Sequence, residues 1–115
     1  MQYLALIYAA PDAGPQYGTP EFKAMLDGYF ALNKLMKENG HHLSGEGLKD
    51  AATATSLRLR GGKVETMDGP FAETKEHLGG YYLIDVPDLD MALKYAAMMP
   101  SAAFGTIELR PVMTY

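Results

Sequence analysis

The sequence contains no cysteine. This absence excludes disulfide bonds, thiolate catalysis and cysteine-ligated metal sites together. A small domain without such cross-links depends on burying apolar side chains, which suits the cytosol, so we expect a cytoplasmic protein. The first residues, Met1-Gln2-Tyr3-Leu4, lack the basic segment and the cleavage site of a signal peptide, and we interpret them as part of the fold.

Long apolar segments and concentrated positive charge are absent as well. The longest apolar run, residues 3–10, is far too short to span a bilayer, so no membrane partner is expected. The chain has 14 Asp and Glu against 10 Lys and Arg, and no basic face interleaved with aromatic residues. This pattern argues against a nucleic-acid partner, while one or two local cations could still hold an acidic substrate. Phosphate-binding loops, nucleophile elbows and His-Glu-x-x-His motifs are missing too.

With 115 residues, of which 48% are hydrophobic, the chain predicts one globular domain over residues 1–115. Residues 3–9 and 80–86 are apolar at nearly every position, as in strands buried on both faces. Thr19-Pro20-Glu21 is a helix start, and an amphipathic stripe follows it as far as Asn39-Gly40.

Further elements complete the pattern. Strands are predicted at residues 41–48 and 104–112, and a second helix between Asp88 and Pro100. Residues 53–67 alternate around Gly61-Gly62, the signal of a β-hairpin with a two-residue turn. The predicted fold class is therefore α+β: a ferredoxin-like split βαβ antiparallel sheet with two helices on one face and an extra β-hairpin.

Two helices can cover only one face of such a sheet. The strands at 3–9 and 80–86 carry apolar side chains on both faces, so five or six large side chains would remain in water. Each would forfeit roughly 1.5–3 kcal/mol, a heavy loss for a marginally stable domain. We therefore predict a homodimer formed through the free sheet face.

The densest polar stretch, residues 68–77, is the first candidate site. Asp68 and Glu73 would act there as acid and base, and Lys75 would hold an anionic group or lower the pKa of a neighbour. The alternative is that Asp68 only forms a turn and the rest is a solvated loop.

Two other pairs of residues could hold a metal or a ligand. His42 and Glu46 would share a face of their strand, but two ligands do not make a zinc site, and neighbouring His41 points away, so no metal is expected. Glu108 and Arg110 share a face of the last strand, either as a surface ion pair or as charges directed into a pocket at the dimer interface.

The stretch Asp68-Gly69-Pro70-Phe71-Ala72-Glu73-Thr74-Lys75-Glu76, followed by Gly79-Gly80-Tyr81-Tyr82, resembles the signature of the DGPF-domain branch of the YCII-related family. The similarity extends to the closing residues 105–112. It implies a dimeric α/β barrel, and many bacterial members of the branch are associated with alternative sigma factors. The wider family is thought to include enzymes that use a His and an Asp in a cleft, and the family's histidine corresponds to Tyr29 in this chain.

These considerations lead to two functional hypotheses. The first is a small-molecule cleft near the dimer interface with cofactor-free, metal-free acid/base chemistry of the lyase or isomerase kind. Its catalytic residues would be Asp68, Glu73 and Lys75, and its substrate-binding residues Glu46, Arg110 and Tyr29. The second is a non-catalytic ligand-sensing or regulatory protein, whose partner is a transcription regulator.

Overall fold

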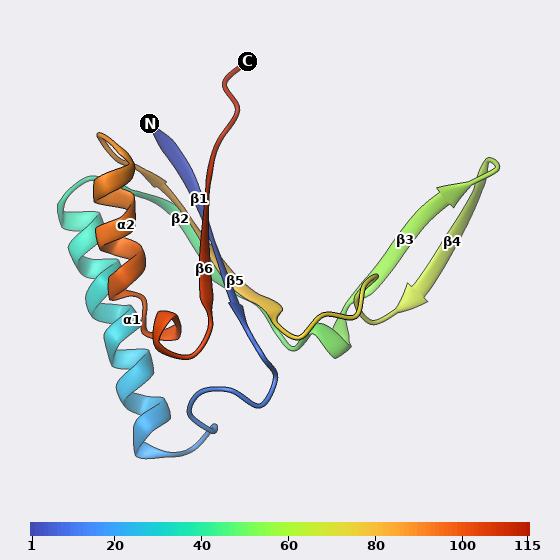
Figure 1. Cartoon of the computed structure of the whole chain (residues 1–115), viewed down its shortest axis with the longest axis horizontal. Helices are drawn as coiled ribbons and strands as arrows, with labels where there is room; N and C mark the ends of the chain where they lie inside the picture. Colours follow the sequence, from blue (N-terminus) through green and yellow to red (C-terminus); the bar gives the residue numbers. More distant parts are fainter.

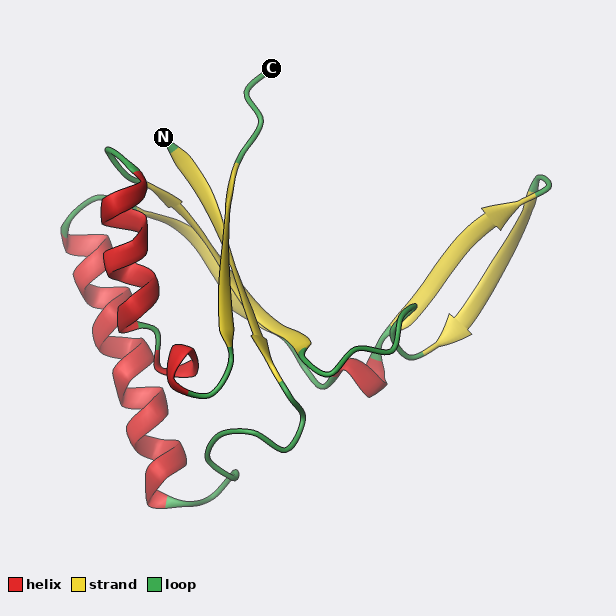
Figure 2. Ribbon diagram, viewed as in Figure 1, coloured by secondary structure: helices red, strands yellow, loops and turns green.

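The computed structural model describes all 115 residues and shows a four-stranded sheet, a separate two-stranded hairpin and two α-helices (Figures 1 and 2). The elements in chain order are β1 (Gln2–Ala9), α1 (Pro20–Glu38), β2 (His42–Gly47), β3 (Thr55–Arg60), β4 (Lys63–Asp68), β5 (His77–Asp85), α2 (Leu89–Met98) and β6 (Thr106–Pro111). Short 3-10 helices lie at Ala51–Thr53 and Pro100–Ala103. Every helix and strand expected from the sequence is present, and only the ends differ.

The four-stranded sheet has the order β2-β5-β1-β6, and each neighbouring pair is antiparallel. β1 and β2 are joined by α1 but are not neighbours, because β5 lies between them and is antiparallel to both. This is the split βαβ arrangement of the ferredoxin-like fold. The predicted fold class is confirmed.

The predicted ends of the helices are confirmed by their hydrogen bonds. Thr19 Oγ1 accepts a hydrogen bond from the Phe22 backbone N–H at 3.2 Å at the start of α1. Asp88 Oδ1 accepts one from the Met91 N–H at 2.9 Å at the start of α2. Gly40 follows α1 with φ +72°, a left-handed conformation that glycine adopts without strain. Local capping therefore fixes where both helices lie along the chain.

Both helices pack on one face of the sheet, and the hydrophobic core lies between these two layers (Figures 1 and 2). Alternate residues of the central strands point toward the helices, which is the two-residue period of a strand. The core consists of Tyr3, Ala5, Ile7, Leu32, Met36, Tyr82, Ile84, Val86, Ala92, Tyr95 and Met99.

The opposite face of the sheet carries the other set of alternate residues, and we call it the open face. Leu4 lies opposite Leu83 and Leu6 opposite Tyr81 across β1 and β5. All four are only partly buried. Figure 2 shows both α-helices on the other side of the sheet. The chain thus leaves the predicted dimer surface uncovered, and the dimer itself stays a prediction.

The β3–β4 hairpin, residues 55–68, projects from the sheet on the side away from the helices (Figure 1), and we call it the arm. Gly61 and Gly62 form its turn with φ values of +56° and +76°. Positive φ at both positions matches the two-residue turn expected from the sequence.

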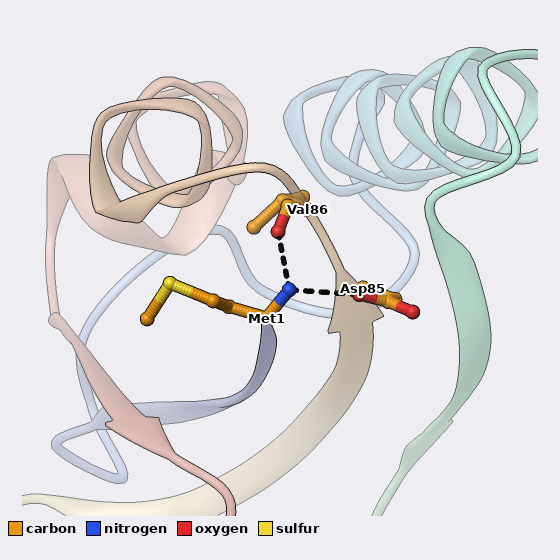
Figure 3. A network of polar contacts seen from close by, with 3 residues as sticks. All are labelled: Met1, Asp85 and Val86. Carbon is orange, nitrogen blue, oxygen red and sulfur yellow. Dashed lines mark hydrogen bonds and ion pairs between the residues drawn. The ribbon is translucent and has the colours of Figure 1, made fainter.

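The amino group of Met1 fastens the first strand to the end of β5 (Figure 3). It donates hydrogen bonds to the Val86 carbonyl oxygen at 2.8 Å and to Asp85 Oδ1 at 3.1 Å. The Val86 N–H returns a bond to the Met1 carbonyl oxygen at 2.9 Å.

No helix of the chain combines the length and the apolar character needed to cross a membrane.

Candidate functional site

A cavity of about 590 Å³ lies between α1 and the end of the sheet where β2 and β5 meet. We call it the α1–β2 cleft. Its walls include Met25, Tyr29 and Asn33 of α1, and its floor includes Gly45 and Gly47 of β2 and Gly80 of β5. Glycines stand here at the helix-facing positions that elsewhere in the sheet hold core side chains. The space between helix and sheet therefore stays open.

Two of these glycines are required by close contacts. A Cβ atom at position 45 would lie 2.5 Å from Cδ1 of Tyr82, and one at position 80 would lie 3.0 Å from the Glu46 carbonyl oxygen. Gly47 differs, because a Cβ there would meet no atom within 4 Å. A larger side chain at position 47 would thus have room to extend into the opening without displacing its neighbours.

A β-bulge in β2 decides which residues face the cleft. The register shifts between His42, which pairs with Ile84, and Ser44, which pairs with Leu83. Because Ile84 belongs to the core, His42 faces the helices, whereas Glu46 pairs with Tyr81 and lies on the open face. The expectation that His42 and Glu46 share a face is therefore wrong, since the extra residue of a bulge inverts the alternation beyond it.

Four polar side chains from α1, β5 and the 3-10 helix Pro100–Ala103 form two hydrogen-bonded pairs in the lining of the cleft. Tyr29 Oη donates a hydrogen bond to Ser101 Oγ at 2.6 Å, and Tyr82 Oη donates one to Asn33 Oδ1. The rings of Tyr29 and Tyr82 have centroids 6.4 Å apart, so the two pairs are adjacent. The His42 ring stands edge-on to the Tyr82 ring, and the two ring centroids are 5.8 Å apart.

The Tyr82 hydroxyl is the titratable group that the cleft perturbs most clearly. Burial, with a smaller effect of the neighbouring Tyr29, raises the pKa of Tyr82 to about 12, against the opposing effect of the Asn33 hydrogen bond. Tyr82 therefore stays neutral across the physiological range and serves as a hydrogen-bond donor. His42 brings an imidazole ring to the same wall of the cleft.

The predicted substrate-binding residues are divided between the two faces of the sheet. Tyr29 lines the cleft from α1, and Glu46 borders it from β2, although its pairing with Tyr81 directs its side chain to the open face. Arg110 also lies on the open face, where its Nε donates to Glu108 Oε2 at 2.7 Å. The structure thus directs one of these three side chains, Tyr29, into the cleft, and it places Arg110 in the ion pair that was one of its two expected roles.

The predicted catalytic residues lie elsewhere. Asp68 ends β4 at the base of the arm, and Glu73 and Lys75 belong to the loop that follows. All three side chains are exposed, and none forms an ion pair. The structure does not bring them into the α1–β2 cleft, and a catalytic role for them stays a prediction.

The loop after β4 borders a second cavity, of about 610 Å³. Gly69 anchors the loop: its N–H donates to the Ala54 carbonyl oxygen at 2.6 Å, and its own carbonyl accepts from Ser56 Oγ at 2.8 Å. Glu76 lines the cavity and accepts a hydrogen bond from Thr106 Oγ1 at 2.8 Å. The carboxylate of this loop that reaches the sheet is therefore Glu76 rather than Glu73.

Sequence reasoning missed most of the cleft, namely Asn33, His42, Tyr82 and Ser101. One usable signal was present, because Gly45 and Gly47 interrupt β2 and Gly80 interrupts β5, whose other helix-facing residues Tyr82 and Ile84 are large and buried. Glycines in the middle of strands often mark a bulge or a close approach. No comparable signal exists for Asn33 or Ser101, since their proximity to the tyrosines depends on how α1 packs.

Comparison with known protein families matches the YCII-related domain over residues 1–115. A related protein, described as uncharacterized, comes from Rhizobium meliloti (strain 1021) and is 34% identical over 117 residues. The alignment covers 100% of this chain and 94% of that relative. Neither match brings a reaction or a ligand with it. Because the family match spans the whole length and the relative is aligned from end to end, this chain belongs to the YCII-related family.

Proposed function

We propose that this protein binds a small organic molecule in the α1–β2 cleft. The observation that carries the proposal is the cavity of about 590 Å³ floored by glycines at core-facing positions. Small-molecule sites usually occupy about 300–1,000 Å³. A void of this size costs stability when it serves no purpose, because the surrounding atoms lose packing contacts. A bound ligand supplies those contacts.

The lining indicates the class of ligand. Roughly half of it is apolar, from residues such as Ile7 and Met25, and the polar groups converge at Tyr29, Asn33 and His42. Lys37 adds a cation to the lining. An apolar body with one or two carbonyl, hydroxyl or carboxylate oxygens matches this distribution. We therefore propose a small carbonyl or carboxylate compound.

The chemistry that we propose is cofactor-free proton transfer of the lyase or isomerase kind. His42 would exchange the proton, and the Tyr29 hydroxyl would donate a hydrogen bond to an oxygen of the substrate. Glu46 and Arg110 remain candidates for binding a ligand on the open face, where their side chains lie. Asp68, Glu73 and Lys75 remain candidates for a role at the loop beside the second cavity.

A non-catalytic ligand sensor would use the same cleft. In that case binding occurs without turnover, and the ligand changes how the protein contacts a regulatory partner, such as a factor associated with alternative sigma factors. The exposed arm supports this alternative, because a projecting hairpin is a surface through which proteins bind each other. Turnover by the isolated protein separates the two cases.

The binding proposal is tested by filling the cleft. Purified protein is screened by thermal shift against small carboxylates, carbonyl compounds and hydroxylated aromatics, beside the variants Gly47→Leu and Ala31→Leu. A ligand at a hundred times its dissociation constant adds about 2.7 kcal/mol of stability. We expect Gly47→Leu to abolish the shift. Ala31→Leu, which places the same leucine side chain on the exposed side of α1, should keep it. Equal shifts in both variants would place the ligand elsewhere.

The proposed proton-transfer chemistry is tested with a compound that binds in the thermal-shift screen. His42→Gln should retain binding and lose turnover, whereas Asp68→Asn should retain both if the cleft is the site. Loss of turnover in Asp68→Asn with an intact fold would instead return the chemistry to the loop after β4. Binding without turnover by the wild-type protein would favour the sensor.

Three further assignments belong to the proposal. Residues 68–76 support placing the chain in the DGPF branch of its family, and the lack of cysteine supports a cytoplasmic location. The partly buried apolar side chains of the open face, Leu4, Leu6 and Leu83, support a homodimer in which two such faces meet. Sedimentation equilibrium of the wild-type protein and of Leu6→Asp tests the homodimer.

A further inference from the structure

The arm has no support from the rest of its own chain. Its two strands hydrogen-bond only to each other and form a sheet separate from the four-stranded one. Figure 1 shows it extending away from the body of the molecule. An isolated two-stranded hairpin is marginally stable in water and ordinarily needs a third strand or a packed face. The arm is thus an element that lacks a packing partner within the chain.

The two faces of the arm differ sharply in character. Across the hairpin, Leu57 pairs with Thr66 and Leu59 with Val64, so these residues share one face. Leu57, Leu59 and Val64 are 64%, 59% and 61% exposed. The other face carries Arg58 opposite Glu65 and Arg60 opposite Lys63. A strand with this alternation is built to bury one face and leave the other in water.

The charge of the arm is opposite to that of the body. The arm, residues 55–68, holds three of the 10 basic residues of the chain, Arg58, Arg60 and Lys63, and two of its 14 acidic residues, Glu65 and Asp68, so it carries a net positive charge. None of the three cations forms an ion pair within the chain. The net charge of the whole chain is −4, so the body outside the arm is more acidic still. Such complementarity steers the arm of one copy toward the body of another.

We propose that the arm docks on the body of a second copy of this chain. The apolar face, made of Leu57, Leu59 and Val64, is buried against the second copy. Arg58, Arg60 and Lys63 project from the opposite, water-facing side of the arm, and their long side chains reach carboxylates of the second copy at the edge of this contact. In a symmetric pair each arm clasps the other body, so the contact forms twice. This contact goes beyond a meeting of the open faces, because it uses an element outside the four-stranded sheet.

The shape of the chain supports the same occupant. The radius of gyration is 16.0 Å and the extents are 48 × 43 × 19 Å. A compact chain of this length has a radius of gyration of about 13 Å. Only 14 of the 115 residues are buried. Nucleic acid or an anionic membrane would satisfy the cations of the arm, but such a partner leaves the acidic body uncomplemented.

The proposal is tested with two matched double variants. Leu57→Asp with Leu59→Asp places charges on the apolar face of the arm, and Leu89→Asp with Leu93→Asp places them on exposed leucines of α2. Sedimentation equilibrium should show a self-association constant at least tenfold weaker for the arm variant and changed less than twofold for the α2 variant. Circular dichroism should show both variants folded, because neither pair lies in the core. If the arm variant does not fold, replacing residues 56–67 by a short glycine linker serves the same purpose.

Two measurements locate the contact itself. Backbone amides of the arm should exchange slowly with deuterium at concentrations where the wild type is dimeric, and fast after dilution. In a mixture of isotopically light and heavy protein, a zero-length amine–carboxylate cross-linker should join Lys63 of one copy to a carboxylate of the other. Arg58→Glu with Arg60→Glu should weaken association and reduce its dependence on salt.

Four outcomes would overturn the proposal. An arm variant that retains the wild-type association constant would show that any dimer forms without the arm. The arm amides could exchange fast at every concentration while the protein is dimeric. Protection of the arm could also arise only when duplex DNA or vesicles rich in anionic lipid are added, which would identify a different partner. A monomeric wild type at millimolar concentration would equally refute the contact.

Discussion

The two antiparallel sheets of this chain are made of similar strands in opposite environments. Ile84 of β5 is completely buried, whereas Leu59 of β3 is 59% exposed. Both are large aliphatic residues at alternating positions of a strand paired with an antiparallel neighbour. The difference arises from α1 and α2, which cover one sheet and not the other (Figure 2). Strand formation is thus a local property, while burial depends on what packs against the strand.

The largest difference in stability is expected between two single variants in which Ile84 and Leu59 are each truncated to alanine. Ile84→Ala should lower the free energy of unfolding by about 2–5 kcal/mol, because it removes buried methyl groups and leaves a cavity. Leu59→Ala should change it by less than about 0.5 kcal/mol at protein concentrations where the chain is monomeric. Urea denaturation followed by circular dichroism measures both.

Measuring the stability of the same two variants at several protein concentrations distinguishes the two environments further. If the arm packs on a second copy, the loss caused by Leu59→Ala grows with protein concentration, because association stabilises the folded state by mass action. The loss caused by Ile84→Ala should stay constant. A loss from Leu59→Ala as large as that from Ile84→Ala in dilute protein would show that the arm is packed within its own chain.

Smaller losses of stability are expected when one side-chain hydrogen bond is removed in the body and one at the base of the arm. Asn33→Ala should lower the free energy of unfolding by about 1–3 kcal/mol, because it leaves the buried Tyr82 hydroxyl without its acceptor. Ser56→Ala removes the bond to the Gly69 carbonyl at the base of the arm and should cost less, since water can replace the partner. In the double variant Asn33→Ala with Tyr82→Phe, part of the loss should be recovered. No recovery would mean that Asn33 acts by packing rather than by this bond.

The fold could be predicted from the sequence because its determinants are local. The cap at Thr19, the glycine at Gly40 and the Gly61-Gly62 turn each act through their nearest neighbours in the chain. Once these fix the order of elements, few topologies remain for two helices and a four-stranded sheet. Because β1 is apolar on both faces, its sequence left open which set of alternate residues faces the helices.

The candidate site could not be predicted in the same way. One extra residue in β2 turns His42 toward the helices, and the nearby Gly45 indicates an irregular strand without giving the position of the bulge. Asn33 and Tyr82 are 49 residues apart in the chain, so their pairing follows from the packing of α1 on β5. The loop at 68–77 has the polar composition of a functional site, although its charged side chains at Asp68, Glu73 and Lys75 lie in solvent.

The pH dependence of stability offers a further test within the body. The pKa of Tyr82 is about 12 in the folded chain against an ordinary value of 10.0, chiefly because of burial. Between these values the unfolded chain loses the proton first, so the free energy of unfolding should fall as the pH rises from about 10 to about 12. Tyr82→Phe should make this fall shallower, whereas Tyr17→Phe, at an exposed position, should leave it unchanged. Identical slopes for the two variants would contradict the raised pKa.

The smallest effect is expected where the body itself is exposed, at the pair formed by Met1 and Asp85. The amino group and the carboxylate are 61% and 50% exposed, so water and salt screen their attraction. Asp85→Asn should therefore lower the free energy of unfolding by less than about 0.5 kcal/mol. The amino group also keeps its 2.8 Å bond to the Val86 carbonyl, which the substitution does not touch. Urea denaturation at low and high salt measures the effect, with Ile84→Ala as the buried reference one residue away. A loss above about 1 kcal/mol that persists in high salt would show that this end of β5 is less exposed than the single chain suggests, as it would be if a second copy covered it.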